Sequence, residues 1–167
     1  MDTSLEIEKF IAATRAFEKW VRDGDSKGEI AGIELLRLLC CLYTAALCLP
    51  PEPLSDEIEP VDGSMRKQII DSFRKRIAID YYGVVFDPLC EPPEAPVTGS
   101  LSDDLAGIYD DVISGLRAYD RGAVPGAIGH WVFSLNCHWG RHITGAIRTL
   151  HCWLAQDFRL CSTDGSE

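Results

Sequence analysis

The feature that most constrains the fold of this 167-residue chain is an apolar stripe in the segment that follows Ser100. Large apolar side chains recur there every three or four positions, at Leu105, Ile108, Tyr109, Val112, Leu116 and Tyr119. Because an α-helix repeats every 3.6 residues, this spacing places the stripe along one side of a helix. Ser100 or Ser102 is suited to cap the first turn, and Gly122 is suited to end the helix. The segment therefore predicts a helix that buries one face.

Four other segments have the pattern of helices. Apolar spacings of three and four mark the first of them, at Ile7, Phe10, Thr14, Phe17 and Val21. A second helix is predicted over about 29–49, where apolar residues occur on nearly every side, as in a helix surrounded by others. A third is predicted from about Ser64, and a last one from the turn that contains Pro125 to about Phe158. Gly140 inside the last helix indicates either a kink or a close helix contact.

Two proline-rich stretches, 50–63 and 87–99, interrupt the helical pattern. Both are predicted to be loops, because proline lacks the N–H that a helix interior needs. Residues 77–86 could extend the third helix or form a short strand, and their periodicity leaves both possibilities open. The chain as a whole predicts an all-α fold, a single-domain bundle of about five helices that spans 1–167. Its core is expected to come from the second, fourth and fifth helices, with the first and third outside them.

Charge and cysteine content narrow the class of protein. The chain carries 26 acidic and 16 basic residues, a net charge of −10, and 46% of its residues are hydrophobic, as in an acidic globular protein. Its seven cysteines are odd in number and include no C-x-x-C pair, so reduced thiols are expected. The longest apolar run, 38–49, is too short to cross a bilayer, and acidic residues near Met1 argue against a signal peptide. We therefore expect a cytoplasmic protein without a membrane segment.

One short motif suggests a chemical role. His138 and His142 are four residues apart in the last predicted helix, so both project from one face and could share a metal ion. Asp104, Asp111 or Tyr109 of the preceding antiparallel helix could approach that face. Trp139 stands where a zincin has glutamate, and no E-x-x-H sequence occurs, so metalloprotease and di-iron chemistry are not indicated. The alternative is that His142 is a hydrogen-bonded core residue and that His138 and Arg141 pair with the acidic face.

Other signatures of catalysis are missing from the sequence. There is no G-x-S-x-G motif and no glycine-rich phosphate loop, and Cys137 points to a different side of the helix from its neighbour His138. We therefore expect no catalytic residue and no cofactor.

The third predicted helix carries a basic strip. Positions 66–76 hold five basic residues and one acidic residue, in a chain whose net charge is negative. Such a strip can dock a partner, or it can face the aspartate-rich helix of the same or a second molecule. Phosphate binding, with Tyr81 and Tyr82 stacking on bases, is a further alternative, but the acidic remainder of the chain would repel a nucleic-acid backbone.

The chain also resembles a known family. The resemblance rests on Y-Y-G-V-V-F-D-P-L at 81–89, G-S-L-S-D-D-L-A-G-I-Y-D at 99–110, G-L-x-x-Y-D at 115–120, and W-x-F-S followed by H-W-G-R-H within 131–142. On these motifs the chain is similar to an uncharacterised bacterial family, domain of unknown function 5063, and 81–157 is the most family-like part. The resemblance implies a small, cytoplasmic, all-helical protein without an established activity.

Together these features predict a non-catalytic protein-interaction or accessory factor, whose partner is an unknown protein or a second copy of the chain. The candidate interaction residues are Arg66, Lys67, Arg74, Lys75, Asp104, Asp111, Trp131, His138, Arg141 and His142. Two alternatives stay open. One is a metal-dependent enzyme that uses the His138 and His142 pair, and the other is a nucleic-acid-associated protein that uses the basic face of the third helix.

Overall fold

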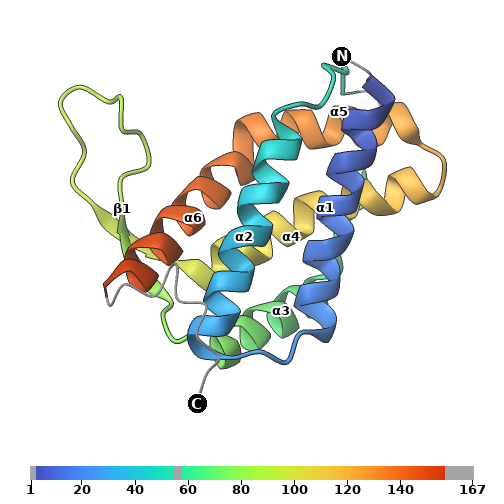
Figure 1. Ribbon diagram of the computed structural model, residues 1–167. Coiled ribbons are helices and arrows are strands. Elements are labelled where there is room, and N and C mark those ends of the chain that lie inside the picture. The colour runs from blue at the N-terminus through green and yellow to red at the C-terminus, as the bar shows by residue number, and fades with distance from the viewer. Residues whose placement is uncertain (1–2, 55–57, 157–167) are drawn as a thin grey trace.

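Helix α4 (Leu101–Asp120) runs through the middle of the molecule and is buried along most of its length (Figure 1). The computed structural model describes residues 3–54 and 58–156. The other α-helices of this part are α1 (Thr3–Asp23), α2 (Gly28–Ala46), α3 (Gly63–Arg76), α5 (Val124–Ser134) and α6 (Gly140–Ala155). To these helices the described residues add a short π-helical turn and a small two-stranded sheet. The predicted all-α bundle is confirmed.

The core is built on the predicted stripe of α4 and on aromatic side chains from both ends of the chain. The buried members of the stripe are Leu105, Ile108, Tyr109, Val112 and Leu116. From α1, Phe10 and Phe17 are fully buried, and the Phe10 ring meets that of Trp131 edge to face, with 4.9 Å between ring centroids. The prediction that the first and third helices lie outside the core is wrong, because the aromatic side chains of α1 fill space beside α4 and α5, and Ile69 and Phe73 of α3 are buried in the same core.

A short turn joins α4 to α5 and sets the two helices side by side. Gly122 in this turn has a φ of +89°, a left-handed conformation that glycine adopts without steric cost. Pro125 lies in the first turn of α5, where its missing N–H removes no helical hydrogen bond. The chain therefore reverses direction within a few residues, and the face of α5 that follows is directed onto α4.

Residues 77–86 include a strand. Strand β1 (Tyr81–Val84) pairs in antiparallel orientation with β2 (Val97–Ser100), and we call residues 81–100 the arm. Figure 1 shows the arm projecting away from the helices beside α6. The predicted loop over 87–99 is corrected at its end, because β2 begins at Val97, where the prolines stop and β-branched residues can pair with β1.

The last predicted helix is continuous but irregular. Helix α5 passes into the π-helical turn η1 (Leu135–Trp139), which passes into α6, and the helix direction changes between α5 and α6 in Figure 1. The predicted end near Phe158 lies outside the described residues. Within the part of the chain that is described, no helix is both long and apolar enough to cross a bilayer.

Candidate functional site

The π-helical turn decides which way the histidine motif faces. A π turn contains one more residue than an α-helical turn, so it rotates everything that follows. At Gly140 an added Cβ would lie 2.1 Å from the Leu135 carbonyl oxygen, a distance that no side chain tolerates. Gly140, expected to mark a kink or a close contact, thus permits a close contact within its own helix. Trp139 beside it is fully buried and fixes the rotation of the turn.

Both histidines of the motif face aspartates of α4. Nδ1 of His138 lies 2.6 Å from Oδ2 of Asp111, and Nδ1 of His142 lies 2.7 Å from Oδ1 of Asp104. The two imidazole rings meet edge to face, with 4.7 Å between their centroids. They lie over Gly107, one turn along α4 from Asp104. We call these contacts the histidine–aspartate pairs, and they join α4 to η1 and α6.

The two pairs differ in exposure. The His138 side chain is 51% exposed, whereas that of His142 is 28% exposed. Because a carboxylate only accepts hydrogen bonds, Nδ1 carries the hydrogen in both rings. Within the described residues, Nε2 of neither ring has a hydrogen-bond partner. Each ring is therefore held by one nitrogen and leaves the other available.

Tyr82 of β1 adds a third side chain to the His142–Asp104 pair. Its hydroxyl group donates a hydrogen bond to Oδ2 of Asp104, the carboxylate oxygen that His142 leaves free. Burial, together with the hydrogen bond and the negative charge of Asp104, raises the pKa of Tyr82, so the hydroxyl group keeps its proton. Asp104 thereby connects α4, α6 and the arm. Sequence spacing gave no signal of this contact, because Tyr82 lies in a different element from both partners.

The site orients imidazole rings, and the part of the chain that the structure describes brings no third potential metal ligand to them. A carboxylate at Nδ1 leaves Nε2 able to accept a proton or bind a metal. Asp104 and Asp111, however, contact the Nδ1 atoms, and the described residues include no group of three potential metal ligands. The observed contacts cross-link α4 to η1 and α6.

The basic strip of α3 is directed in part at α4. Nη2 of Arg66 lies 2.8 Å from Oδ1 of Asp103, so basic and acidic faces meet within one molecule. Arg74 is also paired, as described below. Lys67 and Lys75 are exposed and form no ion pair with another described residue. Pairing therefore removes two of the predicted cations from any surface that could attract a partner by charge.

Asp80 ties α3, the arm and α4 together. Its carboxylate accepts hydrogen bonds from Nε of Arg74 at 2.9 Å, from the Ser102 N–H at 2.9 Å and from the Ser100 hydroxyl at 3.0 Å. Burial by itself would raise the pKa of Asp80, but the hydrogen bonds from Ser102, Arg74 and Ser100 outweigh burial and lower it. Asp80 thus caps the first turn of α4 alongside the predicted cap Ser100. The sequence analysis missed this residue, since it lies far from α4 along the chain.

The two remaining candidate interaction residues have different surroundings. Trp131 is fully buried, and its indole N–H donates to the Val112 carbonyl oxygen at 3.0 Å. Its place among the interaction candidates is therefore corrected to the core, because no partner can reach it. Arg141 is exposed, and its guanidinium donates to the Cys137 carbonyl oxygen at 3.0 Å rather than to an aspartate of α4.

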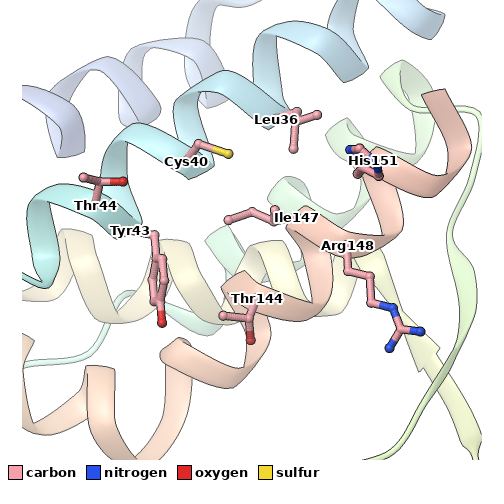
Figure 2. A pocket seen from close by; sticks show the side chains of 8 residues that line it. All are labelled: Leu36, Cys40, Tyr43, Thr44, Thr144, Ile147, Arg148 and His151. Atoms are coloured by element: carbon pink, nitrogen blue, oxygen red, sulfur yellow. The ribbon is translucent and has the colours of Figure 1, made fainter. Parts of the chain in front are cut away.

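An open groove between α2 and α6 was not foreseen from the sequence (Figure 2). We call it the α2–α6 groove, and its volume is about 460 Å³. It is lined by Leu36, Cys40, Tyr43 and Thr44 of α2 and by Thr144, Ile147, Arg148 and His151 of α6. These residues are distant in sequence, and their proximity depends on how two helices cross, which no local pattern reports.

Comparison with models of protein families identifies the family of this chain. A family model described as Domain of unknown function (DUF5063) matches residues 2–156. The chain belongs to this family. The expectation drawn from the motifs is thereby confirmed, and the match extends through the first half of the chain as well.

A solved structure resembles this DUF5063 protein over nearly its whole length. It is the crystal structure of protein BF1032 from Bacteroides fragilis, which is 20% identical in sequence, with a TM-score of 0.73. The superposition covers 90% of this chain and 93% of that chain. At this identity the similarity shows the fold alone. A search of curated proteins found no match, so function has to be argued from the surfaces of the molecule.

Proposed function

We propose that this DUF5063 protein is a non-catalytic interaction factor that presents the arm to a protein partner. The supporting observation is the exposure of large apolar side chains there: Tyr81 is 71% exposed, Phe86 61%, Leu89 87% and Val97 45%. Other large apolar side chains with high exposure are spread over separate elements, at Leu5, Ile30, Leu47, Leu54 and Phe133. Isolated exposed apolar residues are ordinary on protein surfaces, whereas four of them in one projecting segment favour a role for that segment in binding.

The arm is anchored at its base and free at its tip. Asp80 and Tyr82 fix the start of β1 to α4 through the hydrogen bonds described above. Phe86 and Leu89 lie beyond β1, in the connection that Figure 1 shows extending from the helices. A held base reduces the conformational entropy that binding must overcome. These features favour a partner with an apolar cleft that receives Phe86 and Leu89.

The cytoplasm is the proposed location. The six cysteines of the described part are free thiols, as expected for a protein kept in a reducing environment.

The two alternatives have less support from the geometry. For a nucleic-acid site, Arg66 and Arg74 would have to leave their aspartates before they could bind phosphates. For a metal-dependent enzyme, the free Nε2 atoms of His138 and His142 are two ligands, and the described residues do not supply a third. Neither alternative explains the exposed apolar residues of the arm.

The double substitution Phe86→Ser, Leu89→Ser tests the proposal. The full-length wild type and the variant would each be used as bait in nuclease-treated extract of the source cell at low and high salt, with mass spectrometry to identify the proteins recovered. We expect a protein that the wild type recovers and the double variant does not. With that protein purified, the double variant should bind at least about tenfold more weakly, as is typical for loss of buried apolar anchors.

A matched control separates the arm from general surface hydrophobicity. Ile30→Ser with Leu47→Ser removes two equally exposed apolar residues from the region of α2. This control should recover the partner as the wild type does. Recovery unchanged by the arm substitutions, recovery abolished by nuclease, or no recovery by the wild type would each contradict the proposal.

A further inference from the structure

Uncharged side chains line most of the α2–α6 groove. Figure 2 shows Ile147 pointing from α6 toward α2, between Cys40 and Tyr43. Burial and the neighbouring Cys41 raise the pKa of the Cys40 thiol, so this lining residue adds no charge. The groove volume of about 460 Å³ falls within the roughly 300–1,000 Å³ that small-molecule sites occupy. The groove is therefore large enough for a small molecule, which would lie in an open surface groove.

Positive charge gathers on the α6 side of the groove. Arg148 and His151 line it and lie at the end away from Thr44 in Figure 2. Neither side chain forms an ion pair with another described residue. Helix α6 contains no acidic residue, and the groove residues of α2 are uncharged. Arg148 therefore places a positive charge, without an ion-pair partner among the described residues, beside an apolar surface, where it can form a charge-assisted hydrogen bond to an anion.

We propose that the α2–α6 groove binds a small amphiphile, a carboxylate with an unbranched medium-length alkyl chain. The alkyl chain would lie along Ile147 and Leu36, and the carboxylate would meet Arg148, with His151 as a second hydrogen-bond donor. The guanidinium of Arg148 is exposed, so it can turn to meet the head group. This assignment goes beyond the proposed function, because the groove and the arm share no residue.

The dimensions favour a small molecule over a docked helix. The groove residues of α2 run from Leu36 to Thr44, which corresponds to about 12 Å at 1.5 Å per residue. A helix of another protein is about 10–12 Å wide with its side chains. A groove this short would contact little of such a helix, whereas an extended alkyl chain can lie along its whole length.

Titration of the full-length protein with decanoate tests the assignment. Binding would be measured by calorimetry, with backbone amide NMR to locate the site. We expect saturable binding, shifts confined to α2 and α6, and affinity that rises about fourfold per added methylene from hexanoate to decanoate, as transfer of alkyl groups from water predicts. Decanoate at neutral pH should bind more tightly than decanol, because only decanoate carries the negative charge.

Two variants, each with a matched control, test where the carboxylate and the alkyl chain of decanoate bind. Arg148→Gln should weaken decanoate binding at least about fivefold and leave decanol binding unchanged, because it removes a charged hydrogen-bond partner. Arg121→Gln, an exposed arginine in the turn before α5, should have no effect. Thr144→Trp should fill the groove and abolish binding, whereas Ala12→Trp, an equally exposed position on α1, should not. Wild-type-like circular dichroism and unfolding midpoints would show that both groove variants fold.

Three results would overturn the assignment. The first is equal weakening by Arg148→Gln and Arg121→Gln, which would indicate general attraction to surface charge. The second is decanoate binding that survives Thr144→Trp, which would place the ligand elsewhere. The third is no decanoate binding, together with shifts at the groove on addition of an acidic amphipathic peptide, which would make the groove a protein-docking surface.

Discussion

Helix α4 is held through carboxylates on two flanks, and the flanks differ in partner and in burial. Toward α3, Asp103 pairs with Arg66, and both side chains are substantially exposed, 57% and 37%. Toward α6, Asp104 contacts His142 and Tyr82 and is 8% exposed as a residue. Water and salt screen the exposed pair, so it contributes little to stability, whereas the buried carboxylate depends on its partners. Asp103 and Asp104 are adjacent in one helical turn, and we expect Asp104 to contribute much more to stability than Asp103.

The largest expected effect comes from removing each aspartate in turn. Asp104→Ala should lower the free energy of unfolding by about 2–3 kcal/mol, because the half-buried His142 and Tyr82 side chains lose a charged partner. Asp103→Ala should lower it by less than about 1 kcal/mol. Both residues lie in the first turn of α4, so they share a similar interaction with the helix dipole. Denaturant unfolding measures both losses, and equal losses would show that the two flanks do not differ.

Acid should reveal how much the hydrogen bonds to Asp80 contribute to stability, although its partner Arg74 is exposed. Its folded-state pKa is lowered, so its contribution is full above the unfolded-state pKa of about 3.9 and is lost as pH falls through the folded-state pKa. Asp80→Asn should cost about 1–2 kcal/mol at neutral pH and make the acid dependence less steep. The exposed residue Asp71 supplies the control, and Asp71→Asn should change the free energy of unfolding at neutral pH by less than about 0.5 kcal/mol.

Tyr82 and Tyr81 lie on opposite faces of β1, so substituting each in turn tests the contribution of the Asp104 contact on the α6 flank. Tyr82→Phe should cost about 1 kcal/mol, because it removes the donor to Asp104. Tyr81→Phe, at an exposed position, should change stability by less than about 0.5 kcal/mol. The raised pKa of Tyr82 means that its contribution is full below the unfolded-state pKa of about 10 and declines as pH rises toward the folded-state pKa. The wild type should therefore lose stability more steeply than Tyr82→Phe in alkaline unfolding experiments.

The smallest effect is expected at Arg66. Arg66→Gln should change the free energy of unfolding by less than about 0.5 kcal/mol at moderate salt, and the difference should vanish in concentrated salt. Salt-dependent unfolding of the wild type and Arg66→Gln measures this. A larger, salt-insensitive loss would mean that the α3 flank is as important as the α6 flank.

The helices could be predicted because burial of one face is a local property with a fixed period. The apolar stripe of α4 and the proline-rich breaks needed no knowledge of the rest of the chain. The approach of Asp104 and Asp111 to the histidines also followed from sequence, since a short turn between two helices makes them antiparallel. Local pattern and global fold agree at these positions.

The remaining parts depend on contacts between distant segments. Residues 81–84 form a strand because Val97 and its neighbours pair with them, and an isolated periodicity cannot report that pairing. Asp80 and Tyr82 reach α4 only once the arm is folded against it. The alternatives for the basic strip were left open by the sequence for the same reason, because whether Arg66 and Arg74 pair within the molecule depends on Asp103 and Asp80, which lie outside α3.

The π-helical turn makes the number of residues before α6 as important as their identity. Deleting one residue from η1 would restore a regular helix and rotate everything after it by about 100°, the angle between successive residues. His142 would then turn away from Asp104, and Ile143, Ala146 and Leu150 would leave the core in the same movement. The polar contacts and the apolar face of α6 therefore both depend on one rotation of the helix about its axis, which η1 sets. Deleting one residue of η1 is therefore expected to destabilise the protein more than most substitutions do. Inserting one residue between η1 and α6 in the same variant would restore the rotation of α6.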